Sequence, residues 1–463
     1  MSRFENFLST RKALAALYVV FLGAYLGASG VRLLHHSQYN HFVWLADCWL
    51  HGRLALAGQP PNENDWALVE VLKLRDGRVV KGTFGTGNID KFYPLRGTPE
   101  TITPDEIEAR SNIRYVSFPP LPAVFMAPFV AIWGLQFNDV LFSVVWAAIN
   151  PVLLFLLLRD LARRGHSKRS PTDDLWLTAL FGVGSVYFYT ACVGQVWYTA
   201  HVIGVTCALG YAWASIDAKR PWLAGLCLGL GFAARTPMVF MFPLFVLEAV
   251  RTAGGWSKLR ELKKLPPGMG KRVLQFGAAA GLIVALLFIH NFARFESFTE
   301  FGHRFLNIGW KDRIQRWGLF NYHFLSRNLA CALVLLPRIL AKAPFVQVSQ
   351  QGMSLLVTSP NLAYTVMPRE KSPLAPALWL TIAATAIPSL LYQNSGYYQF
   401  GYRFSLDYMV FLVMLLAVGN RRLSWLFKVL VVLAAGINLF GAITFDRYTQ
   451  FTYDDTFFPH GNN

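Results

Sequence analysis

Long apolar runs joined by short basic turns constrain this chain more than any other feature of its sequence. A helix needs about 20 mostly apolar residues to cross a bilayer. Of the 463 residues, 54% are hydrophobic and 15% are charged, whereas a soluble domain carries about 25% charged residues. We therefore predict an all-α polytopic membrane protein with about eleven transmembrane helices, at residues 13–31, 139–158, 174–192, 197–215, 222–234, 236–250, 272–290, 353–367, 375–392, 404–419 and 425–444.

The basic turns orient these predicted helices. A net charge of +17 would indicate nucleic-acid binding in a soluble protein, but the Lys and Arg residues gather in short turns such as 159–169 and 251–272. Loops rich in Lys and Arg stay on the cytoplasmic side of a membrane, so the charge indicates orientation and no nucleic-acid partner. The amino end is then expected inside the cell and the carboxyl end outside.

This orientation divides the chain into six parts. The first span follows Arg3, Arg11 and Lys12 and is too long for a cleaved signal core, so it is expected to remain as an anchor. The parts are a signal-anchor span (1–31), an extracytoplasmic loop (32–137), a block of transmembrane helices (138–290), a second extracytoplasmic segment (291–352), the C-terminal transmembrane helices (353–444) and an extracytoplasmic tail (445–463).

Three segments outside the predicted spans are expected to have secondary structure. Residues 67–75 and 78–84 alternate apolar and polar side chains around Asp76-Gly77, which predicts a small β-hairpin in the first extracytoplasmic loop. The run 118–134 opens with three prolines and is short for a crossing, which favours an in-plane helix at the outer interface. The run 328–346 is interrupted by charges and prolines, and a second interfacial helix is expected there.

Four short motifs occur in an order that resembles the GT-C superfamily of membrane glycosyltransferases. Behind the first span and its large loop come Phe-Pro-Pro-Leu-Pro (118–122), Gly-Leu-Gly-Phe-Ala-Ala-Arg-Thr-Pro (229–237), Gly-Met-Ser-Leu-Leu-Val-Thr-Ser-Pro (352–360) and Gln-Phe-Gly-Tyr-Arg-Phe (399–404). The resemblance extends over nearly the whole chain as architecture. It is strongest to bacterial members similar to the protein O-mannosyltransferase and aminoarabinose-transferase branch.

The resemblance implies a function and a location. Such enzymes move a sugar from a polyprenyl-phosphate carrier, usually with inversion, to a lipid, glycan or protein acceptor. The expected location is the bacterial cytoplasmic (inner) membrane, crossed many times, with the active site on the extracytoplasmic face. The implied partners are the sugar donor, the acceptor and membrane lipid. No motif requires a cofactor or a metal, and no Asp-x-Asp, Walker or Rossmann pattern indicates a soluble nucleotide donor.

A phosphate leaving group at the bilayer surface requires cations, and two arginines are candidates. Arg235 lies at the expected outer turn between two spans, where members of the family often carry a basic residue, and Arg403 lies in an aromatic segment with two glycines. An arginine in an apolar setting costs roughly 2.5 to 3.5 kcal/mol, which favours a functional reason for its presence. An arginine that snorkels to the interface is the alternative interpretation.

The general base is less clear from the sequence. GT-C enzymes generally carry Asp or Glu just after the first span, whereas this chain has Gln-Tyr-Asn-His at 38–41. The nearest carboxylate is Asp47, four residues before His51 and on the same face of a predicted helix. Asp65 is the second candidate for the base, and a turn or capping role is its alternative. His41 is the third candidate.

Further residues are expected to contact the acceptor or the lipid. The segment around Arg403 offers Gln399 and Tyr402, and Tyr115 is expected on the same side of the membrane. His201 and Trp197 lie near that side in the predicted topology, and simple packing is the alternative for each. The rival functions are a polytopic transporter and a non-catalytic GT-C-like lipid-binding or assembly protein. No internal repeat of the kind common in transporters is visible.

Overall fold

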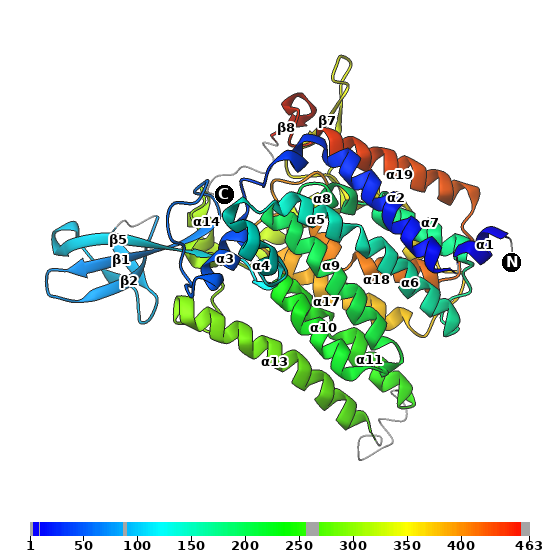
Figure 1. Cartoon of the computed structure of the whole chain (residues 1–463), viewed down its shortest axis with the longest axis horizontal. Coiled ribbons are helices and arrows are strands. Elements are labelled where there is room, and N and C mark those ends of the chain that lie inside the picture. The colour runs from blue at the N-terminus through cyan, green and yellow to red at the C-terminus, as the bar shows by residue number, and fades with distance from the viewer. Residues whose placement is uncertain (1–2, 9, 87–89, 256–267, 455–463) are drawn as a thin grey trace.

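The computed structural model of the chain describes residues 3–8, 10–86, 90–255 and 268–454, in which a small sheet projects from one end of a helical bundle (Figure 1). The helices are α1 (Arg3–Leu8), α2 (Arg11–Ser29), α3 (His41–Leu50), α4 (Leu121–Trp133), α5 (Asp139–Ala147), α6 (Ile149–Arg163), α7 (Pro171–Gly182), α8 (Tyr187–Ala191), α9 (Val196–Ser215), α10 (Pro221–Ala234), α11 (Pro243–Thr252), α13 (Met269–Phe295), α14 (Lys311–Trp317), α15 (Leu325–Leu333), α16 (Leu355–Thr358), α17 (Ala375–Leu391), α18 (Met409–Val418) and α19 (Trp425–Thr444).

Five helical stretches in the described part of the chain are long and apolar enough to cross a membrane. They coincide with five of the predicted spans and comprise Arg11–Leu34, Asp139–Arg163, Val196–Ala218, Met269–Phe295 and Trp425–Thr444. The second stretch joins α5 to α6, and the third begins with α9. The chain therefore has helices of the length and apolarity that its composition predicted. Most of them keep apolar side chains exposed along their length.

The other predicted spans fall on shorter or interrupted helices. Residues 236–250 form the 3-10 helix η5 (Thr236–Met241) and then α11, and residues 353–367 form α16 and the 3-10 helix η8 (Pro360–Val366). Proline at the start of η5, α11 and η8 lacks a backbone N–H and favours a new helix over continuation of the old one. Broken helices are tolerated at membrane depth where protein surrounds them. The total of eleven crossings stays a prediction.

Close helix contact in the bundle depends on glycine. Helix α10 packs along α13, and at Gly225 a Cβ atom would collide with the Phe276 carbonyl. A side chain at this position would push the two helices apart. The pair runs from the sheet end of the bundle to its far end (Figure 1), so glycine here fixes the separation of two long elements.

The projecting sheet has five antiparallel strands in the order β4-β3-β2-β1-β5. The strands are β1 (Trp66–Leu74), β2 (Val79–Phe84), β3 (Lys91–Pro94), β4 (Glu100–Thr101) and β5 (Ile107–Val116). Strands β1 and β2 pair on either side of Asp76-Gly77, with Lys73 opposite Val79. The register of β1 with β5 places Trp66 opposite Val116. The sheet therefore extends well beyond the two strands that the alternation indicated.

The helix expected after Phe118 is present as α4, which packs against α3 at the base of the sheet (Figure 1). Its in-plane orientation stays a prediction. The prediction of a second interfacial helix over 328–346 is wrong for the second half of that range. Helix α15 ends at Leu333, and the chain continues into β6 (Arg338–Ile339) and β7 (Val346–Ser349), which pair with each other, while β7 also pairs with β8 (Thr452–Tyr453). Pro337 and Pro344 supply no backbone N–H for a helix in this stretch.

Two of the predicted features lie outside the described residues. These are the basic residues of the turn within 256–267 and the end of the predicted tail, 455–463.

Candidate active site

Asp65 lies in the turn that leads into β1, at the base of the sheet. Its backbone adopts φ 62°, a left-handed conformation that Asp tolerates better than most residues. The Ser117 hydroxyl donates a hydrogen bond of 2.9 Å to the Asp65 carbonyl, which ties the turn to the end of β5. The indole N–H of Trp197, at the start of α9, donates a 2.8 Å bond to Asp65 Oδ2. The turn therefore points the carboxylate toward the helical bundle.

Burial raises the pKa of Asp65 to about 6, and the Trp197 hydrogen bond and the charge of Arg403 oppose that rise. A base with a pKa near the working pH combines a deprotonated state with useful basicity. At neutral pH this carboxylate is mostly ionised. Asp65 therefore has protonation behaviour that suits a general base and is a candidate for that role.

Arg403, whose charge acts on the Asp65 carboxyl, is buried, with 6% of its surface exposed. Its Nη1 donates to the Tyr398 carbonyl at 3.0 Å, and its guanidinium carbon lies 5.2 Å from the centre of the Tyr198 ring. Its Nε has no hydrogen-bond partner, and in the described part of the chain no carboxylate forms an ion pair with it. A buried cation with spare donors is a candidate for binding an anion.

Two features of the neighbouring loop hold Arg403 in place. The Gln399 side chain accepts a bond from the Arg403 backbone N–H at 2.9 Å and donates to the carbonyls of Gln351 and Ser395. Gly401 packs so tightly that a Cβ atom there would collide with Val186. Gln399 therefore braces the loop that carries Arg403, and its expected contact with substrate stays a prediction.

Arg235 caps the end of α10 and forms a two-point ion pair with Asp407. Its Nε and Nη2 lie 2.5 and 2.9 Å from the two carboxylate oxygens, and Asp407 is 1% exposed. The His201 Nδ1 lies 3.3 Å from the same carboxylate. Because Asp407 compensates the charge of Arg235, this arginine offers less attraction to an anion than Arg403 does.

The ring of Phe404 joins the two predicted phosphate-binding arginines. The guanidinium carbon of Arg235 lies 5.4 Å from the ring centre and that of Arg403 lies 5.6 Å from it. The structure thus brings Asp65, Arg403 and Arg235 into one neighbourhood, together with Trp197 from α9. This cluster, defined by these four residues, is hereafter the arginine–carboxylate site.

Asp47 and His51 lie elsewhere, at the end of α3. Arg53 Nη2 approaches Asp47 Oδ2 at 3.3 Å, and His51 Nδ1 lies 3.4 Å from Oδ1, with the His51 side chain 61% exposed. The i,i+4 contact that the sequence predicted exists. It forms part of a surface ion pair, however, and neither residue has a contact with the arginines of the site among the described interactions.

The remaining candidate site residues mostly make packing contacts with neighbouring side chains. His41 stacks on Trp66 at 3.8 Å between ring centres, and burial lowers its pKa to about 4, so it is neutral and weakly basic at pH 7. Tyr115, in β5, packs against Phe295 at the end of α13, with 5.3 Å between ring centres. Tyr402 is buried beside Phe404, 5.9 Å between ring centres, and its hydroxyl has no hydrogen-bond partner. Tyr402 borders the arginine–carboxylate site, and His41 lies next to it, since its Nε2 is 3.2 Å from the carbonyl of Asn64, the residue before Asp65.

Sequence patterns did not indicate Asp407 or Tyr198 as site residues. Asp407 falls inside the predicted span 404–419, where an acidic residue is itself a signal of function or of a buried partner. Its partner Arg235 is 172 residues away, so only the fold reveals the pair. Tyr198 follows Trp197 directly. An aromatic pair at the start of a span is typical of the interfacial belt of a membrane helix, so this pattern alone does not indicate a site residue.

Across residues 3–8, 10–86, 90–255 and 268–454, no group of three or more His, Cys, Asp and Glu side chains is arranged to hold a metal ion.

The comparisons with known proteins gave one match. No curated protein and no solved structure matches the chain. The model of glycosyltransferase family 87 matches residues 115–258, a segment that includes Trp197, His201 and Arg235. Together with the long apolar helices, this match confirms the predicted resemblance to a membrane glycosyltransferase, while the branch within that class stays a prediction. Over 115–258, the chain is similar to glycosyltransferase family 87.

Proposed function

We propose that this protein is a GT-C type, inverting glycosyltransferase that uses a polyprenyl-phosphate-linked sugar as donor. The observation that carries the proposal is the half-buried carboxylate of Asp65 beside the buried, unpaired guanidinium of Arg403. A base and an anion-binding cation in one site match the two needs of the reaction. The acceptor is a lipid, a glycan or a protein, and the reaction takes place at the outer face of the bacterial cytoplasmic membrane.

The proposed reaction has one displacement step. Asp65 accepts the proton of the acceptor hydroxyl as its oxygen attacks the anomeric carbon of the sugar. The bond between that carbon and the phosphate oxygen breaks, and its electron pair leaves with the polyprenyl phosphate. Attack from the face opposite the leaving group inverts the anomeric configuration. Arg403 stabilises the negative charge that grows on the phosphate, which is the larger source of rate enhancement in many such reactions.

The charge at the site favours a single phosphate in the donor. Asp407 compensates Arg235, so Arg403 supplies the one buried positive charge in the arginine–carboxylate site without a carboxylate partner. A sugar joined to a polyprenyl monophosphate carries one negative charge in its phosphodiester. A diphosphate-linked donor would add another charge, for which the site has no second uncompensated arginine.

Release of polyprenyl phosphate tests the proposal against its rivals. The purified full chain in lipid is incubated with a labelled polyprenyl-phosphate sugar and with membrane extract as the source of acceptor. A transferase releases polyprenyl phosphate and labels an acceptor. A transporter or a non-catalytic lipid-binding protein leaves the labelled donor intact, and that result would refute the proposed function.

The pH dependence of the rate should follow Asp65. With its pKa raised to about 6, the carboxyl becomes protonated as the pH falls through that value and can no longer accept a proton. We expect kcat/KM to be level above about pH 7 and to fall roughly tenfold per unit well below pH 6. A pH–rate profile of the purified protein, corrected for stability at each pH, measures this fall in kcat/KM, the acidic limb of the profile.

Trp197→Phe should move that limb toward higher pH. The variant removes the hydrogen bond that stabilises the ionised form of Asp65, so the pKa of the carboxyl rises. A hydrogen bond to a charged group contributes about 1.5 kcal/mol or more, which corresponds to a shift of about one pH unit. If Trp197 only packs, the variant lowers the rate and leaves the limb in place.

The side of the membrane is tested by cysteine labelling. The prediction places the sheet outside the cell and the turn at 159–173 inside, because this arrangement keeps the basic clusters on one side. Four of the five native cysteines are buried, so background labelling is low. A cysteine engineered at Asp76 should react with an impermeant reagent in intact cells. Reaction only after permeabilisation would invert the topology.

A further inference from the structure

A hairpin projects from the side of the bundle at the end where α2 and α19 finish. It comprises residues 333–346, which follow α15 and lead through β6 to the start of β7, and it is hereafter the lateral hairpin. Ile339 of β6 pairs with Val346 of β7, and the Leu340 N–H donates to the Phe345 carbonyl at 2.8 Å. In Figure 1 this hairpin, drawn in yellow above β7, extends across the direction of α19, whereas the five-stranded sheet extends beyond the end of the bundle.

The surface of the lateral hairpin is apolar and basic. Ile339 is 77% exposed and Phe345 is 59% exposed, and the side chains of Arg338 and Lys342 are exposed between them. No Asp or Glu occurs in the sequence over residues 313–369. Exposed apolar side chains of this size are unfavourable in water, and a contiguous group of them marks a contact surface. Basic residues beside apolar ones are typical of segments that lie in a membrane interface.

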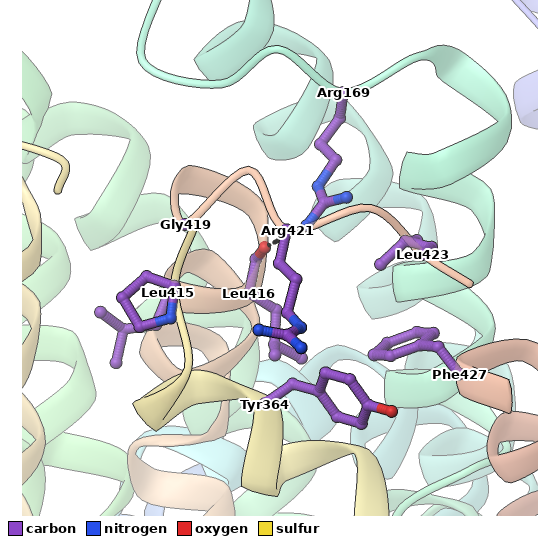
Figure 2. A pocket seen from close by; sticks show the side chains of 9 residues that line it. Arg169, Tyr364, Leu415, Leu416, Gly419, Arg421, Leu423 and Phe427 are labelled. Atoms are coloured by element: carbon purple, nitrogen blue, oxygen red, sulfur yellow. Dashed lines mark hydrogen bonds between the residues drawn. The ribbon is translucent and has the colours of Figure 1, made fainter. Parts of the chain in front are cut away.

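Helix α19 fixes the level of this surface relative to the membrane. It has 20 residues, a length of about 30 Å, which equals the thickness of the hydrocarbon core of a bilayer. It starts at the end of the bundle that carries the basic turns, where Phe427 lines a small cavity together with Arg169 and Arg421 (Figure 2). Trp425 at this start is exposed, as is typical of the boundary between membrane and water. The other end of α19 therefore reaches the opposite surface of the bilayer.

The root of the lateral hairpin lies at that opposite surface. Beyond α19 the chain turns back, and the ring of Phe451 packs on Phe440 near the end of the helix, with 5.4 Å between ring centres. Strand β8 follows directly and pairs with β7 in parallel. The guanidinium carbon of Arg338 lies 3.6 Å from the centre of the Tyr453 ring in β8. The hairpin therefore leaves the bundle at the level of the end of α19, where the lipid head groups lie.

We propose that the lateral hairpin lies in the leaflet opposite the basic turns and binds anionic phospholipid there. Ile339 and Phe345 contact the acyl chains, and Arg338 and Lys342 contact the phosphates. Long basic side chains can keep their charge at the head groups while their apolar stems stay in lipid. Two positive charges at an anionic surface add an attraction that salt weakens. This inference does not depend on the proposed transferase activity.

Fluorescence quenching measures the position of the hairpin. Ala341, which is exposed at its tip, is replaced by Cys and labelled with a fluorophore, and the full chain is reconstituted in vesicles of phosphatidylcholine with phosphatidylglycerol. Four of the five native cysteines are buried, and wild type treated with the label gives the background. Lipids with a nitroxide on the acyl chain should quench the Ala341→Cys label strongly, and acrylamide in the water should quench it weakly. The same label in Asp76→Cys, at the exposed turn of the sheet, is the matched control and should show the reverse.

The role of charge is tested in the labelled chain. Phosphatidylglycerol should increase lipid quenching over that in pure phosphatidylcholine, and Arg338→Gln with Lys342→Gln should lose this increase. Lys73→Gln with Lys91→Gln, at two exposed lysines of the sheet, should keep it. An unchanged increase in the hairpin variant would overturn the assignment to anionic lipid.

Two other results would contradict the position itself. Equal quenching of the two labels by the nitroxide lipid would place the hairpin in water and overturn the proposal. Protection of the Ala341→Cys label from both quenchers would mean that protein covers the hairpin, either a partner or a second copy of this chain, and would overturn it as well.

Discussion

Asp65→Asn should lower turnover by about a hundredfold to ten-thousandfold, the range for loss of a general base. Asn keeps the size of the side chain and one acceptor for the Trp197 N–H, but it cannot take the proton of the acceptor hydroxyl. The loss should appear in kcat, with donor affinity close to that of wild type, because the base contributes to the transition state and not to phosphate binding. Single-turnover kinetics and a separate donor-binding measurement give the two quantities.

Asp47→Asn is the matched control. It removes a carboxylate of the same type from the nearby helix α3, but one engaged in a partly exposed ion pair with Arg53 at 3.3 Å. Such pairs contribute roughly 0 to 1 kcal/mol, so turnover should stay near the wild-type value. Collapse of turnover in Asp47→Asn with normal turnover in Asp65→Asn would transfer the role to Asp47. Normal turnover in both variants would leave His41 as the base or an acceptor that needs none.

The choice between these two carboxylates shows what sequence alone could not decide. The spacing of Asp47 and His51 correctly predicts that the two side chains meet, since i,i+4 neighbours on a helix lie on one face. Spacing does not reveal which way that face points. The direction of Asp65 depends on a left-handed backbone at its own position and on Trp197, which is 132 residues away. Both are consequences of the fold.

The same distinction applies to the helices. Apolar length predicts α13 and α19 well, because an uninterrupted run of that length has few alternatives to a helix in lipid. It fails to foresee that 353–367 is split into α16 and η8 at Pro360, or that α15 gives way to strands. In these stretches the pairing of strands and the burial of broken helices depend on neighbours that are distant in sequence.

Arg403→Gln should weaken binding of the polyprenyl-phosphate donor by about 1.5 to 3 kcal/mol, roughly tenfold to more than a hundredfold, the range for hydrogen bonds to a charged group. Arg403 supplies a buried charge that forms no ion pair with a carboxylate in the arginine–carboxylate site, so its loss removes the main attraction for the phosphate. Arg403→Lys should recover part of the affinity, because the charge remains while the planar fork that contacts Tyr198 and Tyr398 is lost.

Donor affinity is measured by titration of the purified chain with a labelled, non-transferable donor analogue. Arg304→Gln is the control, since Arg304 is 53% exposed and pairs with Glu300 outside the site, and its donor affinity should equal that of wild type. Unchanged affinity in Arg403→Gln, in a variant whose thermal unfolding matches wild type, would exclude Arg403 as the phosphate ligand. Because Asp407 already occupies two donors of Arg235, that result would move the phosphate away from both arginines and remove the basis for a donor site at the base of the sheet.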